Sequence, residues 1–89
     1  MKINPNYKLR TIAGEHIIVN QGGSHADMTR IISLNPSACM LWQALEGREF
    51  TTSEAAGLLV EKYGIANEQA LTDAAHWIER LQAVGAIVQ

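Results

Sequence analysis

Several features that define common classes of protein are scarce in this sequence. Its 89 residues include a single cysteine, Cys39, so no disulfide can form within the chain, and we expect it in the reducing cytoplasm. No apolar run is long enough to span a membrane, and Met1–Pro5 lacks the apolar core of a signal peptide. The formal net charge is only −2, so we expect neither nucleic acid nor a membrane as a partner.

The residue groupings that carry out catalysis or bind metals are also missing. Ser24, His25 and Asp27 are the residue types of a hydrolase triad, but neighbours in a glycine-containing loop cannot hold the geometry of a triad. The three histidines are widely spaced, and Cys39 is not at metal-ligand spacing from any of them. Gly22-Gly23 is not followed by a helix and a lysine, as a phosphate-binding loop is. We therefore expect no enzyme, no cofactor and no metal site.

The sequence does contain enough apolar residues for a packed core. It is 47% hydrophobic and 18% charged, a balance typical of a folded domain and not of a disordered chain. The length fits one small domain, residues 1–89, with little room for an enclosed active site.

The first third of the chain predicts three strands. Tyr7–Ile12 is rich in strand-forming residues, and a turn at Ala13–Glu15 leads into a second strand at His16–Asn20. After a polar loop, Gln21–Asp27, the third strand is expected at Met28–Leu34. Alternation along this third strand places Met28, Ile32 and Leu34 on one side and Ile31 on the other.

Three helices are predicted to follow, each ended by a glycine. They are expected at Pro36–Glu46, Ser53–Tyr63 and Asn67–Val84. Asn35 is a good N-cap and Pro36 suits the first helical position, so the third strand passes into the first helix almost without a loop. The apolar face of the second helix is predicted at Ala55, Leu58, Leu59 and Tyr63. The third helix has a wide apolar stripe, with Leu71, Ala74, Ile78 and Leu81 in one row and Ala70, Trp77 and Val84 beside it.

This order of elements predicts an α+β fold, a three-stranded antiparallel sheet followed by a three-helix bundle, with a winged-helix-like layout. Two functions that need no active site stay open. A winged-helix domain binds DNA through one helix, but the last helix has Glu68, Asp73 and Glu79 against one arginine, and DNA repels that charge. A module that dimerises by pairing a free strand edge with a second copy is the other alternative.

An ordered set of motifs runs from Met28 to Val88. Around the first helix it comprises Leu34-Asn35, Ala38, Leu41-Trp42 and Leu45-Glu46-Gly47; around the second, Thr51-Thr52-Ser53-Glu54, Leu58-Leu59 and Tyr63-Gly64; around the third, Asp73, Trp77-Ile78, Leu81 and Gly85-Ala86-Ile87. This ordered set resembles the PqqD family of peptide-binding domains, which are also called RiPP recognition elements.

The resemblance implies a non-enzymatic chaperone for peptides. Such a protein binds the leader segment of a ribosomally made precursor peptide and presents it to a modifying enzyme, often of the radical S-adenosylmethionine type, in the synthesis of pyrroloquinoline quinone (PQQ) or another peptide-derived product. The leader adds as a strand to the outer edge of the third strand, beside the last helix. The residues so implied are Thr29, Arg30, Ile31, Ile32 and Ser33 on the strand and Asp73, Ala74, Trp77, Arg80 and Leu81 on the helix.

The chain departs from family members devoted to PQQ synthesis at two places. Those members carry a Pro-Glu pair shortly before the Leu-Asn motif, where this chain has Arg30-Ile31-Ile32-Ser33, and Ala74 stands where a larger aliphatic residue is common. The resemblance therefore implies a carrier for a different peptide pathway.

Overall fold

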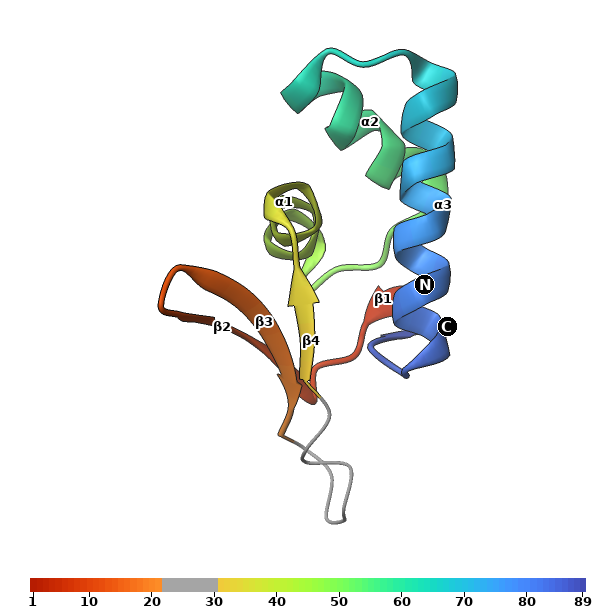
Figure 1. Ribbon diagram of the computed structural model, residues 1–89. Coiled ribbons are helices and arrows are strands. Elements are labelled where there is room, and N and C mark those ends of the chain that lie inside the picture. The colour runs from red at the N-terminus through yellow and green to blue at the C-terminus, as the bar shows by residue number, and fades with distance from the viewer. Residues whose placement is uncertain (22–30) are drawn as a thin grey trace.

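The computed structural model describes residues 1–21 and 31–89 and shows three helices and two small sheets (Figure 1). The elements are β1 (Lys2–Ile3), β2 (Tyr7–Ile12), β3 (Glu15–Asn20), β4 (Ile31–Leu34), α1 (Pro36–Leu45), α2 (Thr52–Tyr63), α3 (Asn67–Ala83) and β5 (Ile87–Val88). The predicted α+β layout is confirmed. The predicted loop from Gly22 onward and the first three residues of the predicted third strand, 28–30, lie outside the described residues.

The main sheet is antiparallel in the order β2-β3-β4, so β2 and β4 are its two edges. A two-residue turn joins β2 to β3, and both of its residues have positive φ, 53° at Ala13 and 82° at Gly14. Such a turn matches the right-handed twist of the strands on either side of it. The predicted turn is confirmed, with glycine at one of the two positions where positive φ is required.

One face of the main sheet packs on the core and the other is open. Ile18 is paired with Ile32, and both side chains, together with Leu34, belong to the core or pack against it. Ile31 lies on the opposite face and is 59% exposed. The alternation predicted for the third strand is thus confirmed over its described part.

Helix α1 begins at the end of β4, as predicted. The Asn35 side chain accepts a hydrogen bond from the Ala38 backbone N–H at 2.8 Å, and Pro36 occupies the first turn. The helix buries Leu41, Trp42 and Leu45 and stands between the sheet and the α2–α3 pair (Figure 1). This junction anchors β4 directly to the helical part of the core.

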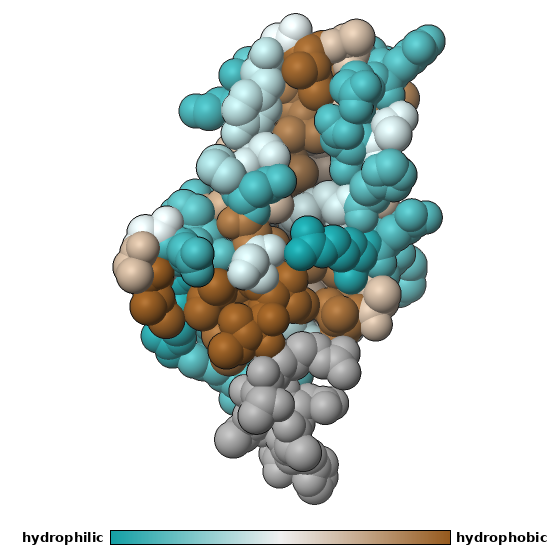
Figure 2. Space-filling view, viewed as in Figure 1, coloured by the Kyte–Doolittle hydropathy of each residue, from teal (hydrophilic) through white to brown (hydrophobic). Residues whose placement is uncertain are grey.

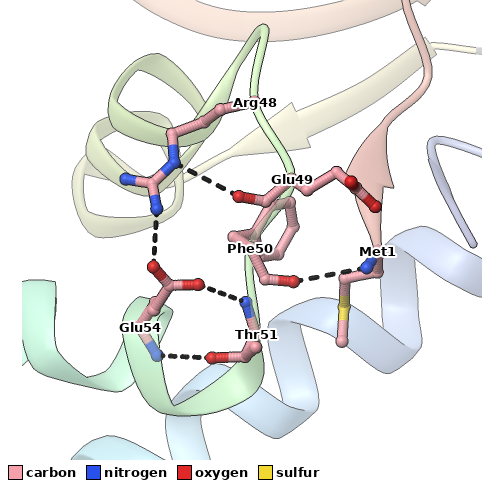
Figure 3. Close-up of polar contacts among 6 residues, drawn as sticks. All are labelled: Met1, Arg48, Glu49, Phe50, Thr51 and Glu54. Carbon is pink, nitrogen blue, oxygen red and sulfur yellow. Dashed lines mark hydrogen bonds and ion pairs between the residues drawn. The ribbon is translucent and has the colours of Figure 1, made fainter.

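The connection from α1 to α2 is held by polar contacts (Figure 3). Thr51 and Glu54 form a capping box, in which the Thr51 hydroxyl accepts from the Glu54 N–H at 3.1 Å and the Glu54 carboxylate accepts from the Thr51 N–H at 2.9 Å. The same carboxylate pairs with the Arg48 guanidinium at 2.6 Å. Because Thr51 is the cap, α2 begins at Thr52, one residue before the predicted start.

Phe50 lies at the centre of this connection, and the sequence analysis did not single it out. Its backbone N–H donates to the Met1 carbonyl at 2.8 Å, and its carbonyl accepts from the Met1 amino group at 3.3 Å. The buried ring lies 6.1 Å from the ring of Trp77, centroid to centroid. Phe50 therefore supports Trp77 from behind, within the contact range of aromatic pairs.

The faces predicted for α2 and α3 need correction at two positions. Leu71 is 38% exposed and Tyr63 is 45% exposed, although both were placed on buried faces. The rest of the predicted faces is largely confirmed, because the structure buries Ala55, Leu59, Ala70, Ala74, Trp77, Ile78 and Leu81.

A second, two-stranded sheet joins the two ends of the chain, and the sequence analysis did not predict it. Lys2 is paired with Val88 and Ile3 with Ile87. Ala86 and Ile87 are buried, so the C-terminal end of the chain packs on the core. Two-residue strands have no periodicity that sequence patterns can detect. No helix within residues 1–21 and 31–89 has both the length and the apolar character to cross a membrane.

Candidate functional site

The outer edge of β4 carries main-chain groups that no described strand pairs with. Residues of an antiparallel strand point their N–H and C=O groups alternately toward one neighbour and the other. The Gln21 N–H donates to the Asn6 carbonyl at 2.8 Å, so Gln21, and with it Val19 and Ile17, directs its main-chain groups toward β2. By the same alternation, Ile18 directs its groups toward β4 and its partner there, Ile32.

The remaining residues of β4 therefore point outward. Ile32 and Leu34, paired with Ile18 and His16, use their main-chain groups within the sheet. Ile31 and Ser33 direct their N–H and C=O groups away from β3. We call these outward groups of Ile31 and Ser33 the β4 edge.

Arg80 of α3 reaches across to the β4 edge. Its guanidinium donates a hydrogen bond to the Ser33 carbonyl oxygen at 3.3 Å. This contact agrees with the outward direction of the Ser33 carbonyl obtained from the strand pairing. It also places the C-terminal half of α3 beside the strand, as the implied cleft between strand and helix requires.

A pocket of about 540 Å³ opens where β4 passes into α1. Its apolar lining comes from all three helices and the α2–α3 connection: Ala38, Leu41, Leu59, Ile65 and Trp77. Asp73, His76 and Arg80 of α3 supply ionisable groups, and we call the whole the helix pocket. Figure 2 shows apolar surface in the hollow between α2 and α3, flanked by polar side chains, and a broad apolar patch over the sheet.

The structure brings part of the implied site together. Ser33 and Arg80 are hydrogen-bonded, and Asp73, Trp77 and Arg80 share the helix pocket. Ile31 is exposed, and Ile32 packs partly against the core. Thr29 and Arg30 lie outside the described residues.

The other helix residues of the implied site are in the core. Ala74 and Leu81 are fully buried, and Trp77 is only 7% exposed. Ala74 and Leu81 therefore have no surface to offer a partner in this conformation. Trp77 presents an edge to the helix pocket while most of its ring packs inside.

The sequence analysis missed the contributions of α1 and α2 to this region. Tyr63 and Leu59 of α2 and Asn35 at the start of α1 line the helix pocket together with Trp77. Tyr63 offered a signal, since an aromatic residue at the exposed end of a helix marks a possible contact surface. Its place beside Trp77 follows only from the packing of α2 on α3.

The arrangement suits recognition of a chain segment. Among the residues that the structure describes, no three potential metal ligands come together. A strand edge with free donors and acceptors, next to an apolar pocket, accepts an extended peptide through its main chain and selects among side chains through the pocket.

A comparison with protein families identifies the lineage of the chain. The family described as "Coenzyme PQQ synthesis protein D (PqqD)" matches residues 15–87. The chain belongs to the PqqD family. The match spans β3, β4, all three helices and Ile87 of β5, and it confirms the resemblance seen in the ordered motifs.

Solved structures share the fold of this PqqD-family chain. One, "Lasso peptide synthetase B1 complexed with the leader peptide", is 16% identical with a TM-score of 0.75 and covers 99% of this chain and 96% of its own. Another, "TbiB1 in Complex with the TbiA(beta) Leader Peptide", is 15% identical with a TM-score of 0.75 and covers 97% and 93%. No curated protein sequence matches the chain. The predicted fold is therefore confirmed over nearly the whole length.

Proposed function

We propose that this PqqD-family protein, with residues 1–89 as one domain, is a non-enzymatic chaperone that binds the leader segment of a ribosomally made precursor peptide. The leader adds as a further strand to the β4 edge. The observation that carries the proposal is the pair of outward-facing residues, Ile31 and Ser33, beside an α3 helix that reaches the strand through Arg80.

Affinity in this proposal comes from main-chain hydrogen bonds. Ile31 and Ser33 each offer one N–H and one C=O. Hydrogen bonds between main chains depend little on which side chains the peptide carries. Thr29 and Arg30, which precede Ile31 in the chain, are proposed to extend this contact.

Selectivity comes from the helix pocket. Its apolar lining accepts an aliphatic or aromatic side chain of the leader, with the edge of Trp77 as one wall. Asp73 and Arg80 lie at the same surface and form hydrogen bonds or ion pairs with polar side chains of the leader. Ala74 and Leu81, being buried, act by holding α3 in place and not by touching the peptide.

The fold comparisons support this ligand class. The two solved structures described above are complexes with a leader peptide. Their identity to this chain is 16% and 15%, so the likeness in fold makes a leader peptide the first candidate to test.

In this proposal the carrier presents its leader to a modifying enzyme, of the radical S-adenosylmethionine type, in the cytoplasm. The product is PQQ or, given the departures in the third strand and at Ala74, another peptide-derived compound. Pairing of two copies through the β4 edge would compete with the leader, because both use the same main-chain groups.

The test is a titration of ¹⁵N-labelled protein with synthetic peptides. The peptides correspond to the N-terminal halves of the short reading frames that adjoin the gene. We expect one of them to shift the amide signals of Ile31–Leu34 and of α3 around Trp77 and Arg80. Saturable shifts confined to other surfaces, or no shift with any of these peptides, would refute strand addition at β4.

Two further measurements separate the alternatives. Light scattering over a range of protein concentrations detects pairing of two copies. A gel-shift series across salt concentrations detects DNA binding, which weakens steeply with salt because phosphate contacts release counterions. Exposed Glu68, Asp73 and Glu79 on α3 lead us to expect no shift of DNA.

A further inference from the structure

Arg80 is a cation without a carboxylate partner in the described part of the chain. Its one hydrogen bond there is to the neutral Ser33 carbonyl. Asp73, two turns earlier on the same surface of α3, accepts instead from the Gln69 amide at 2.8 Å. A guanidinium has five N–H donors, so most of the hydrogen-bonding capacity of Arg80 is unused by these protein groups.

The position of Arg80 conflicts with strand addition. A peptide strand on β4 needs the Ser33 carbonyl as an acceptor for one of its own N–H groups. Arg80 already occupies that acceptor in the free protein. When a peptide binds, its N–H competes with Arg80 for this oxygen, and the charged group of Arg80 lies between the added strand and the apolar helix pocket, which it also lines.

We infer that Arg80 is a specificity-determining residue that covers the β4 edge in the free protein and selects peptides carrying Asp or Glu. The inference rests on the proposed function. A neutral peptide leaves the displaced guanidinium with water alone in a partly apolar setting. A carboxylate offers it two parallel, charge-assisted hydrogen bonds, which are the strongest that arginine makes with a side chain.

The geometry of the sheet limits where the acidic residue stands. The peptide residue hydrogen-bonded opposite Ser33 turns its side chain to the open face of the sheet, as Ser33 does. Its two neighbours in the peptide turn theirs toward the helices, as Ile32 and Leu34 do. The acidic residue is therefore one of these two neighbours, and an apolar residue two positions further on reaches the helix pocket.

The experiment is a selection from a random twelve-residue peptide library displayed on phage. The library is panned against the wild-type protein, Arg80→Gln and Arg80→Glu. Arg10→Gln, which removes an arginine from the opposite edge of the sheet, is the matched control. Amide protection of Ile31 and Ser33, followed by NMR, reports whether a selected peptide adds to β4.

We expect wild-type and Arg10→Gln to enrich peptides with Asp or Glu at one fixed position. Changing that residue to the amide should lower affinity about tenfold, the size of a charge-assisted hydrogen bond. On Arg80→Gln the same change should cost less than about twofold, and Arg80→Glu should enrich Lys or Arg there. Neutral peptides should bind Arg80→Gln about two- to fivefold more tightly than wild-type, since Ser33 is uncovered.

The outcomes separate this inference from the function on which it rests. Peptides that protect the β4 edge but show no acidic preference, or keep that preference on Arg80→Gln, overturn the role of Arg80 and leave the chaperone proposal standing. If no selected peptide protects Ile31 and Ser33 in any variant, the chaperone proposal fails and the inference fails with it.

Discussion

The two edges of the main sheet are built differently. The β2 edge is six residues long and presents the charged side chains of Lys8 and Arg10. The described part of β4 has four residues, none charged, and lies beside α3 and the helix pocket. Charged side chains along an edge strand hinder its pairing with another chain.

The difference shows how one sheet can keep one edge closed and the other available. β2 is protected by its own side chains. Within residues 1–21 and 31–89, the side chain that covers the β4 edge is that of Arg80, through a hydrogen bond at 3.3 Å. A contact of this kind contributes little stability at an exposed site, so a peptide can displace it.

The largest expected effect is on the stability of the protein, and it distinguishes two neighbouring residues of β4, Ile31 and Ile32. Ile32→Pro should lower the free energy of unfolding by about 3 kcal/mol, because it removes a hydrogen bond to β3 and a partly buried side chain. Ile31→Pro should change it by less than about 1 kcal/mol, because the lost N–H faces outward. Urea denaturation followed by circular dichroism measures both. Equal losses for the two variants would show that the N–H groups of Ile31 and Ile32 do not point in opposite directions.

The next largest effect is on leader binding, and it is tested by placing proline in each of the two edge strands. Ile31→Pro removes an outward donor of β4 and should weaken leader binding about tenfold or more, by the loss of a main-chain hydrogen bond and the strand conformation around it. Thr11→Pro removes an outward donor of β2, by the same alternation, and should leave affinity within about twofold. Fluorescence anisotropy with a labelled leader measures both. A larger loss for Thr11→Pro would move the site to β2.

A smaller effect tests how β4 is anchored. Asn35→Ala removes the N-cap of α1 and should lower the free energy of unfolding by about 1 kcal/mol. Thr51→Ala removes the cap of α2 and should have a similar effect on stability. Hydrogen exchange should separate the two, with amides around the β4–α1 junction losing protection only in Asn35→Ala. If both variants lose protection at the β4–α1 junction equally, Asn35 does not anchor β4 more than Thr51 does.

The smallest effect tests the protection of β2. Replacing both charges, with Lys8→Val and Arg10→Val, leaves the fold intact and makes that edge apolar. We expect weak, concentration-dependent self-association, which sedimentation velocity detects, while the wild-type protein and a Lys8→Arg variant stay unassociated at the same concentrations. If the double variant does not associate, charge is not what keeps β2 unpaired.

The elements with strong local signals were predictable. Asn35-Pro36 and Gly64 each act within one helical turn, and the structure shows the cap and the stop that they predict. The motif set that resembles the PqqD family spans these same positions. Of the candidate site, the sequence indicated the strand and the helix that carry Ser33 and Arg80.

The rest depended on packing between distant segments. The periodicity of α3 fits a buried position equally well for the neighbours Ala70 and Leu71, and the packing of α3 on α2 buries Ala70 and leaves Leu71 38% exposed. The pairing of Lys2–Ile3 with Ile87–Val88 joins the two ends of the chain and leaves no local pattern. The position of Tyr63 in the helix pocket depends on the same α2–α3 contact.

By itself, the sequence determined the type and order of the three main-sheet strands and the three helices and the strand-to-helix junction at Leu34–Pro36, because hydrophobic period, capping and glycine act over a few residues. The ordered motifs along these elements also indicated the family. Only the tertiary structure decided that Ser33 points outward, that Arg80 covers its carbonyl and that all three helices share one pocket. Those features depend on strand register and on the close fit of side chains far apart in the chain, and neither can be read from a single segment.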